Sequence, residues 1–138
     1  MPLTLTLTEG VLPAGDEKVA FQRLGNAMLK WHGLSGNAAM TRNVVGTLHV
    51  LPQGHAFAGM EATPAAFIEW KVPSFAFTDP AVQKGYFTEA TDIIHELSGG
   101  KFPRDKVFIN VVHAVDGAWN FDGEPMTNDE IGAAITAG

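Results

Sequence analysis

The chain has 138 residues, which suits a single domain with room for a hydrophobic core. Its net charge is −6, and lysine and arginine do not cluster along the sequence. Binding nucleic acid or an anionic membrane surface requires such clusters, so neither partner is expected. The absence of cysteine excludes disulfides, thiolate nucleophiles and Cys-ligated metals. No apolar run approaches the roughly 20 residues of a membrane span, and no signal-peptide pattern opens the chain, so we expect a cytoplasmic protein.

The first half predicts a strand, a helix and a second strand. Residues 3–8 alternate leucine and threonine, which is typical of a strand with one buried face. Residues 16–33 have apolar residues at helical spacing, with Asp16 as the candidate N-cap and Gly33 at the end. Residues 44–51 form an apolar strand, and the proline and glycines of 52–59 predict turns.

The second half predicts the same order. Residues 67–77 resemble a strand, but Pro73 cannot donate a ladder hydrogen bond and so favours an edge or a bulge. Asp79-Pro80 predicts the start of a helix that ends at Gly99-Gly100. Residues 107–115 are apolar on both strand faces. In the tail, the spacing of Thr127 and Glu130 is that of a capping box and predicts a short terminal helix.

A loose internal repeat relates the two halves. Residues 49–59 recur as 113–123, at an offset of 113 − 49 = 64. We therefore expect one domain over residues 1–138, with repeat one at about 2–60, repeat two at about 65–123 and a tail at 124–138. Right-handed crossovers place both helices on one face of a four-stranded sheet, an α/β (α+β) fold of duplicated β-α-β units. The other face of strand 107–115 is then uncovered, which favours a closed symmetric oligomer.

Three further motifs are Met1-Pro2 opening a strand, the run 49–52 before Phe57, and the run 105–110 followed by Trp119-Asn120. Together with the duplicated β-α-β units, these motifs resemble the tautomerase superfamily, most closely its macrophage migration inhibitory factor branch. The 4-oxalocrotonate tautomerases and malonate semialdehyde decarboxylases are further members of that superfamily. The resemblance implies a cofactor-independent homotrimer with three pockets at its subunit interfaces, each built around the N-terminal proline.

Pro2 is the candidate catalytic residue. An α-amine titrates near 8 in a peptide, and burial among apolar groups disfavours its charged form, which leaves a base at neutral pH. Making an enol needs such a base and a hydrogen-bond donor at the developing oxyanion, roles that Pro2 and Asn110 could fill. The base requires removal of Met1, and the alternative is that Pro2 merely begins a strand.

Two departures from the family point to an apolar substrate. Leu34 stands where the family has a lysine that helps to hold a carboxylate, and Phe108 stands where it has a tyrosine. We therefore expect a small apolar or aryl carbonyl substrate. The expected substrate-binding residues are Asn110, Phe108, Pro73, Phe75 and Trp119. A replacement charge could come from Arg42, Lys71 or His32, although each is also typical of a solvated surface position.

Other candidate sites are weaker. His49 and His113 occupy equivalent repeat positions, which favours a shared structural contact over catalysis. No His, Asp and Glu cluster has ligand spacing, so neither a metal nor another cofactor is expected. The sequence thus predicts an isomerase that performs keto–enol tautomerisation. The alternatives are a non-catalytic or cytokine-like binding member of the same fold, and a proline-dependent hydratase or decarboxylase.

Overall fold

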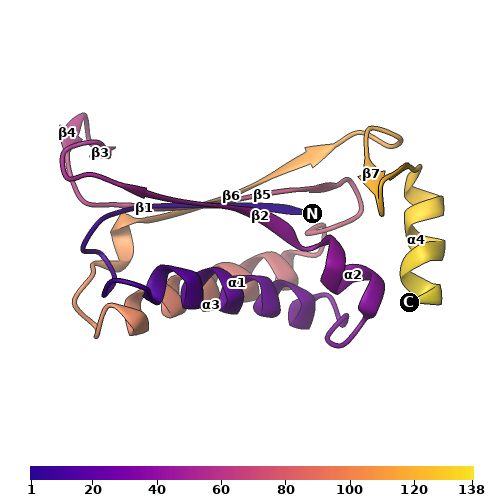
Figure 1. Cartoon of the computed structure of the whole chain (residues 1–138), viewed down its shortest axis with the longest axis horizontal. Helices are drawn as coiled ribbons and strands as arrows, with labels where there is room; N and C mark the ends of the chain where they lie inside the picture. The colour runs from indigo at the N-terminus through magenta and orange to yellow at the C-terminus, as the bar shows by residue number, and fades with distance from the viewer.

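A four-stranded mixed sheet with two long helices on one face forms the centre of the computed structural model, which describes residues 1–138 (Figure 1). The main elements are β1 (Pro2–Thr8), α1 (Asp16–Trp31), α2 (Ala38–Asn43), β2 (Val45–Leu51), β5 (Ala66–Pro73), α3 (Pro80–Leu97), β6 (Val107–Ala114) and α4 (Asn128–Ala137). A 3-10 turn (Arg104–Lys106) precedes β6. Two small hairpins, β3 (Phe57–Ala58) with β4 (Glu61–Ala62) and β7 (Asn120–Phe121) with β8 (Glu124–Pro125), follow β2 and β6.

The sheet has the strand order β2-β1-β5-β6. β1 pairs with β2 in parallel, and β5 pairs with β6 in parallel, so each pair and its connecting helix make one β-α-β unit. The two units meet through the antiparallel pair β1 and β5. This architecture confirms the expected fold class.

The leucines of β1 account for its position between the layers. Leu3, Leu5 and Leu7 are fully buried, because alternate residues of a strand point to opposite faces and these point toward the helices. Behind them, the indole of Trp70 on β5 donates to the hydroxyl of Tyr86 on α3 at 2.7 Å. That hydroxyl donates to a backbone carbonyl of α1 at 3.0 Å, so one buried chain of hydrogen bonds joins the sheet to both helices.

The other face of the sheet is open in a single chain. Phe108 and Val112 on β6 are 41% and 44% exposed there, and Phe108 stacks on Phe67 of β5 at 5.5 Å between ring centroids. Val107, Ile109 and Val111 alternate with them and pack against the core. The expectation that 107–115 would be covered on one face only is therefore confirmed within the chain.

Three details of the sequence-based prediction were wrong. Pro73 was expected to mark an edge strand or a bulge, but β5 is an interior strand that ends at Pro73. Because proline is its last residue, the missing N–H removes no hydrogen bond from the middle of the ladder. Gly15, rather than Asp16, is the N-cap of α1, and the carboxylate of Glu17 accepts from its N–H. The six-residue helix α2 was not predicted.

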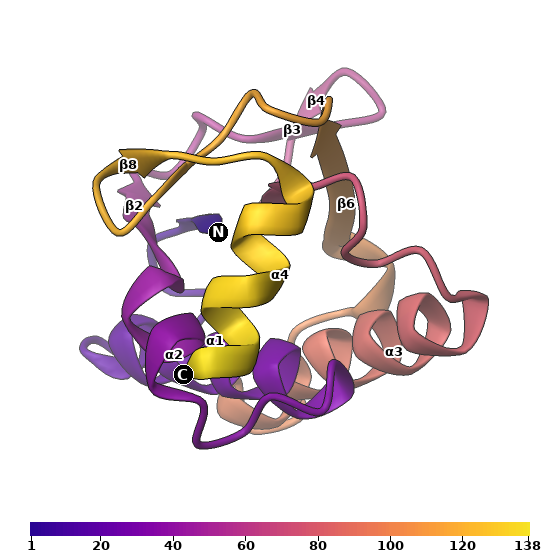
Figure 2. The ribbon, with the colours of Figure 1, turned by 90° about the vertical axis from the view of Figure 1, so that its right-hand side faces the viewer.

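Helix α4 stands across one end of the sheet and helix layers, beside the amino terminus (Figure 2). Its predicted capping box is present: the Thr127 hydroxyl accepts from the N–H of Glu130, whose carboxylate accepts from Thr127 in return. None of the helices is both long enough and apolar enough to cross a membrane.

Candidate functional site

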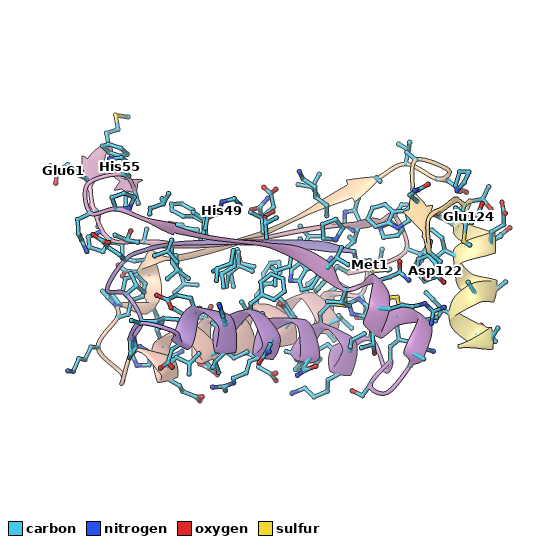
Figure 3. The ribbon with its side chains drawn as sticks, viewed as in Figure 1. Met1, His49, His55, Glu61, Asp122 and Glu124 are labelled. Atoms are coloured by element: carbon cyan, nitrogen blue, oxygen red, sulfur yellow. The ribbon has the colours of Figure 1, made fainter.

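The amino terminus opens into an apolar pocket of about 320 Å³. The pocket lies at the start of β1, between α1, α2, the loop after β5 and α4. Its lining is Met1, Met28, His32, Leu34, Met40, Phe75, Ala76, Gly132, Ile135 and Thr136. Figure 3 shows Met1 at this end of the molecule, near Asp122.

The α-amine of Met1 is the one ionisable group of this pocket whose pKa is clearly shifted. Met1 is 4% exposed, and its amine donates a hydrogen bond to the backbone carbonyl of Asn43 at the end of α2. Burial disfavours the ammonium form and lowers the pKa of this amine to about 6. An amine with that pKa is mainly uncharged at pH 7 and can accept a proton.

The loop after β5 is held rigidly where it enters the pocket. It carries Phe75 and Ala76 into the lining, and the next residue, Phe77, has the left-handed φ of 54° that non-glycine residues rarely adopt. The Phe77 N–H donates to Nε2 of His32 at 3.1 Å, and its carbonyl accepts from the side-chain amide of Gln83 at 2.7 Å. These contacts stabilise the strained backbone and fix this wall.

His32 lines the pocket as a neutral group. Its Nε2 accepts from the Phe77 N–H, so the ring hydrogen resides on Nδ1, which lies 2.9 Å from the carbonyl of Met28. Both ring nitrogens are therefore used. His32 is neither a solvated surface residue nor a free cation for a substrate.

The nearby cation is already paired. The guanidinium of Arg42 donates two hydrogen bonds of 2.8 Å to the carboxylate of Asp122, and the side-chain amide of Asn43 donates a third. These donors lower the pKa of Asp122 to about 2. Lys71 lies on the open sheet face, 3.8 Å from the carboxylate of Glu69. The pocket lining contains no lysine or arginine, and no group of three or more acidic or histidine side chains in the chain is placed to hold a metal ion.

Three of the expected site residues lie at this end of the sheet. Pro2 begins β1 beside Val45, with a nitrogen that is an amide while Met1 precedes it. Because β5 runs antiparallel to β1, its last residue, Pro73, returns to the start of β1. Phe75 follows two residues later and lines the pocket.

Asn110, Phe108 and Trp119 do not line the pocket. Asn110 is on β6, where it pairs with Glu69 of β5. β6 is two strands away from β1 in the sheet, a separation of about 10 Å at the usual strand spacing. Phe108 lies farther along the same strand from the amino terminus. Trp119 packs against the core just before β7. Within one chain, the residues on the open face of β6 therefore lie away from the amino-terminal pocket.

Sequence reasoning missed the contribution of α4, which provides Gly132, Ile135 and Thr136. The capping box predicted this helix but carried no information on where it docks. The predicted common contact of the two repeat histidines was also wrong. His113 lies 2.7 Å from the carbonyl of Ala76 and helps to hold the pocket loop, whereas His49 contacts only the nearby Thr47.

Similarity to known proteins is found in structure alone. No family model matches the chain, and no curated protein matches its sequence. The structure of Pt0534 inactivated by 2-oxo-3-pentynoate has a TM-score of 0.74 and 19% identity, covering 96% of this chain and 99% of that one. A fused 4-OT symmetric trimer has a TM-score of 0.76 and 10% identity, covering 96% of this chain and 99% of that one. The structure of N1, a member of the cis-3-chloroacrylic acid dehalogenase family, has a TM-score of 0.72 and 13% identity, covering 94% of this chain and 87% of that one.

These likenesses establish the tautomerase fold over nearly the whole chain. At identities this low they establish the fold and no shared activity. The three structures are of a 4-OT, a dehalogenase-family member and Pt0534, so the assignment to the migration inhibitory factor branch stays a prediction.

In the chain that retains Met1, we expect the α-amine to titrate at about pH 6 instead of its ordinary 8.0. Between about pH 6 and pH 8 the amine is therefore less protonated in the folded state than in the unfolded state. The free energy of unfolding should accordingly increase as pH rises through this range. The Cα chemical shift of labelled Met1 reports the titration, with urea-unfolded protein as the control. Equal midpoints in the two states would contradict burial of the amine.

Proposed function

We propose that this protein is a cofactor-independent tautomerase of the tautomerase superfamily. In this proposal Pro2, freed by removal of Met1, is the general base for keto–enol tautomerisation of a small apolar or aryl carbonyl compound. The observation that carries the proposal is the burial of the amino terminus at the start of β1, where burial lowers the pKa of the Met1 amine to about 6. Pro2 is the next residue, and we propose that its amine, once free, is a base at neutral pH for the same reason.

The proposed reaction is a proton transfer in two steps. The neutral amine removes a proton from the carbon next to the substrate carbonyl, the C–H electrons form the carbon–carbon double bond, and the carbonyl π electrons move to oxygen. The protonated amine then gives up its proton, which reaches the enolate oxygen through water, so that the enol forms and the neutral base is restored; the reverse sequence gives the ketone.

The proposal assigns the oxyanion donor to a second subunit. Asn110 lies on the open sheet face, too far along the sheet from β1 to act within its own chain. A homotrimer would bury that face and could bring Asn110 and Phe108 of one subunit to the amino terminus of the next. Support comes from the fused 4-OT structures, which are trimers of the same fold.

An uncharged substrate fits the lining best. Leu34 and Phe75 line the pocket, His32 is neutral, and Arg42 is held by Asp122. Transferring a carboxylate from water into such a pocket is unfavourable unless a cation pairs with it. We therefore propose aryl or alkyl ketones and keto esters in preference to dicarboxylates.

Two other functions remain as alternatives. A binding member without catalysis is favoured if Met1 stays in place, because Pro2 then has only an amide nitrogen. A proline-dependent hydratase or decarboxylase is suggested by the dehalogenase and by the FG41 malonate semialdehyde decarboxylase, which has a TM-score of 0.67 and 12% identity.

Pro2→Ala should lower the rate of enolisation by about 10²–10⁴, the usual range for a positioned general base. The variant keeps an α-amine, but a primary and less rigid one. Intact-mass measurement establishes that Met1 is absent from both proteins, and Pro64→Ala, an exposed proline, is the matched control. Wild-type turnover in Pro2→Ala would eliminate the proline mechanism, and retained Met1 in the active wild-type protein would do the same.

A keto ester should be processed at least as well as its parent keto acid. Leu34→Lys, which places a cation in the pocket wall, should shift the ratio of kcat/KM for acid over ester upward by about tenfold, as one charge-assisted hydrogen bond permits. Leu34→Met is the isosteric control. A strong preference of the wild-type protein for the acid would show that a cation does reach the substrate.

The protein should sediment as a homotrimer at micromolar concentration. Phe108→Glu places a charge on the open face of β6 and should dissociate the trimer. Lys18→Glu, an exposed substitution on the helix layer, should leave it intact. A stable wild-type monomer is the outcome that contradicts this assembly.

A further inference from the structure

Helix α4 is anchored at both ends across the pocket. At its start, the Asn128 side chain donates to the hydroxyl of Ser74 at 2.8 Å, and its backbone N–H donates to Asp116 at 2.8 Å. At its end, the Asn37 side chain donates to the carbonyl of Ile135 at 2.8 Å. Between these anchors Ile131 is fully buried. The helix is therefore a fixed wall of the pocket.

Gly132 lies within this helix and faces the pocket. Glycine is among the least favourable residues in a helix interior, because it loses the most backbone freedom and buries no side chain. Neither backbone geometry nor packing requires it here. Gly132 is not among the glycines with positive φ, and an added Cβ would meet nothing within 4 Å.

Two other glycines show what a packing requirement looks like in this chain. A Cβ on Gly85 in α3 would lie 2.3 Å from the ring of Trp31, and one on Gly138 would lie 2.5 Å from Ala39. Their neighbours occupy the space, so those positions are closed to larger residues. At Gly132 the corresponding space is empty and belongs to the pocket.

The rest of the α4 wall offers no charge and no free donor. Ile135 is apolar, and the hydroxyl of Thr136 donates to the carbonyl of Gly132 at 2.9 Å. A ligand group against this wall gains by burying apolar surface and finds no partner for a polar substituent.

We infer that Gly132 is a specificity-determining residue, which leaves room for the apolar aryl or branched alkyl substituent of the carbonyl substrate. This inference rests on the proposed function, and it places the part of the substrate remote from the reacting carbonyl beside Gly132. Ile135 completes the surface against which that substituent packs.

Substitution at Gly132 tests this assignment with two keto esters, methyl phenylpyruvate, which carries an aryl group, and methyl pyruvate, which lacks it. The aryl group also makes the α-carbon more acidic, but this intrinsic effect is the same for every variant and cancels when the ratio of the two substrates is compared between variants. In Gly132→Leu, kcat/KM for the aryl ester should fall at least tenfold relative to the small ester, and Gly132→Ala should give a smaller shift. Ala133→Leu, at the exposed neighbouring position, should leave the ratio unchanged. An equal change for both esters, or none, would overturn the assignment.

A binding measurement separates this inference from the proposed function. If the wild-type protein turns over neither ester, the tautomerase proposal has failed, and titration with acetophenone tests the pocket alone. If acetophenone binds more weakly to Gly132→Leu than to Ala133→Leu, the inference that Gly132 leaves space for an aryl group is supported. Equal binding to the two variants, or no binding to the wild-type protein, overturns the inference. Thermal melting and sedimentation of Gly132→Leu complete the test: loss of the fold or of the native oligomer would mean that protein atoms fill this space.

Discussion

An amino group in water is charged and well hydrated, so a fold that places its first residue among apolar side chains favours the uncharged amine there. β1 imposes this condition because it is an interior strand, paired on both sides and carrying three buried leucines. Its first residues cannot fray into solvent without breaking those pairings. The backbone carbonyl of Asn43 then supplies the one polar partner that the terminal amine retains.

The residues around the amino terminus also keep the guanidinium of Arg42 from being free to pair with a ligand. Asn43 accepts from the amine through its backbone, and its side chain helps to hold Asp122 in place for Arg42. The guanidinium therefore lies close to the amino terminus but has its donors committed to a carboxylate. The pocket therefore offers apolar surface, including Leu34 and Phe75, and no free cation.

Local sequence patterns predicted the main helices and strands. Features that depend on contacts between residues far apart in the sequence could not be predicted. The leucine and threonine alternation of residues 3–8, the Asp79-Pro80 start and the capping box at Thr127 each report local geometry, and each element is present. Helix α2 is too short to show a period. The docking of α4 depends on Asn37 and Ser74, which are far away in sequence, so no local pattern could place it.

Sequence reasoning identified part of the pocket. Of the residues that the resemblance singled out, Leu34 and Phe75 line the pocket, whereas Pro2 begins β1 beside it and is not in the lining, and its catalytic role stays a prediction. The contributions of Asn110 and Phe108 stay predictions, because they depend on contacts between subunits that one chain does not contain. The pocket-facing Gly132 gives no signal in sequence, since a helix glycine can equally mark close packing, as Gly85 does.

The antiparallel pairing of β1 and β5 gives the two halves of the chain opposite directions. An approximate twofold axis thus runs through the middle of the sheet, and the start of β5 lies at the far end from the start of β1. At that far end Ala66 follows Ala65 through a peptide bond, so its nitrogen is an amide that does not titrate. The two ends of the sheet therefore share a backbone arrangement and differ in charge chemistry: one end holds an ionisable amine, and the other end holds only amide nitrogen at the equivalent strand start.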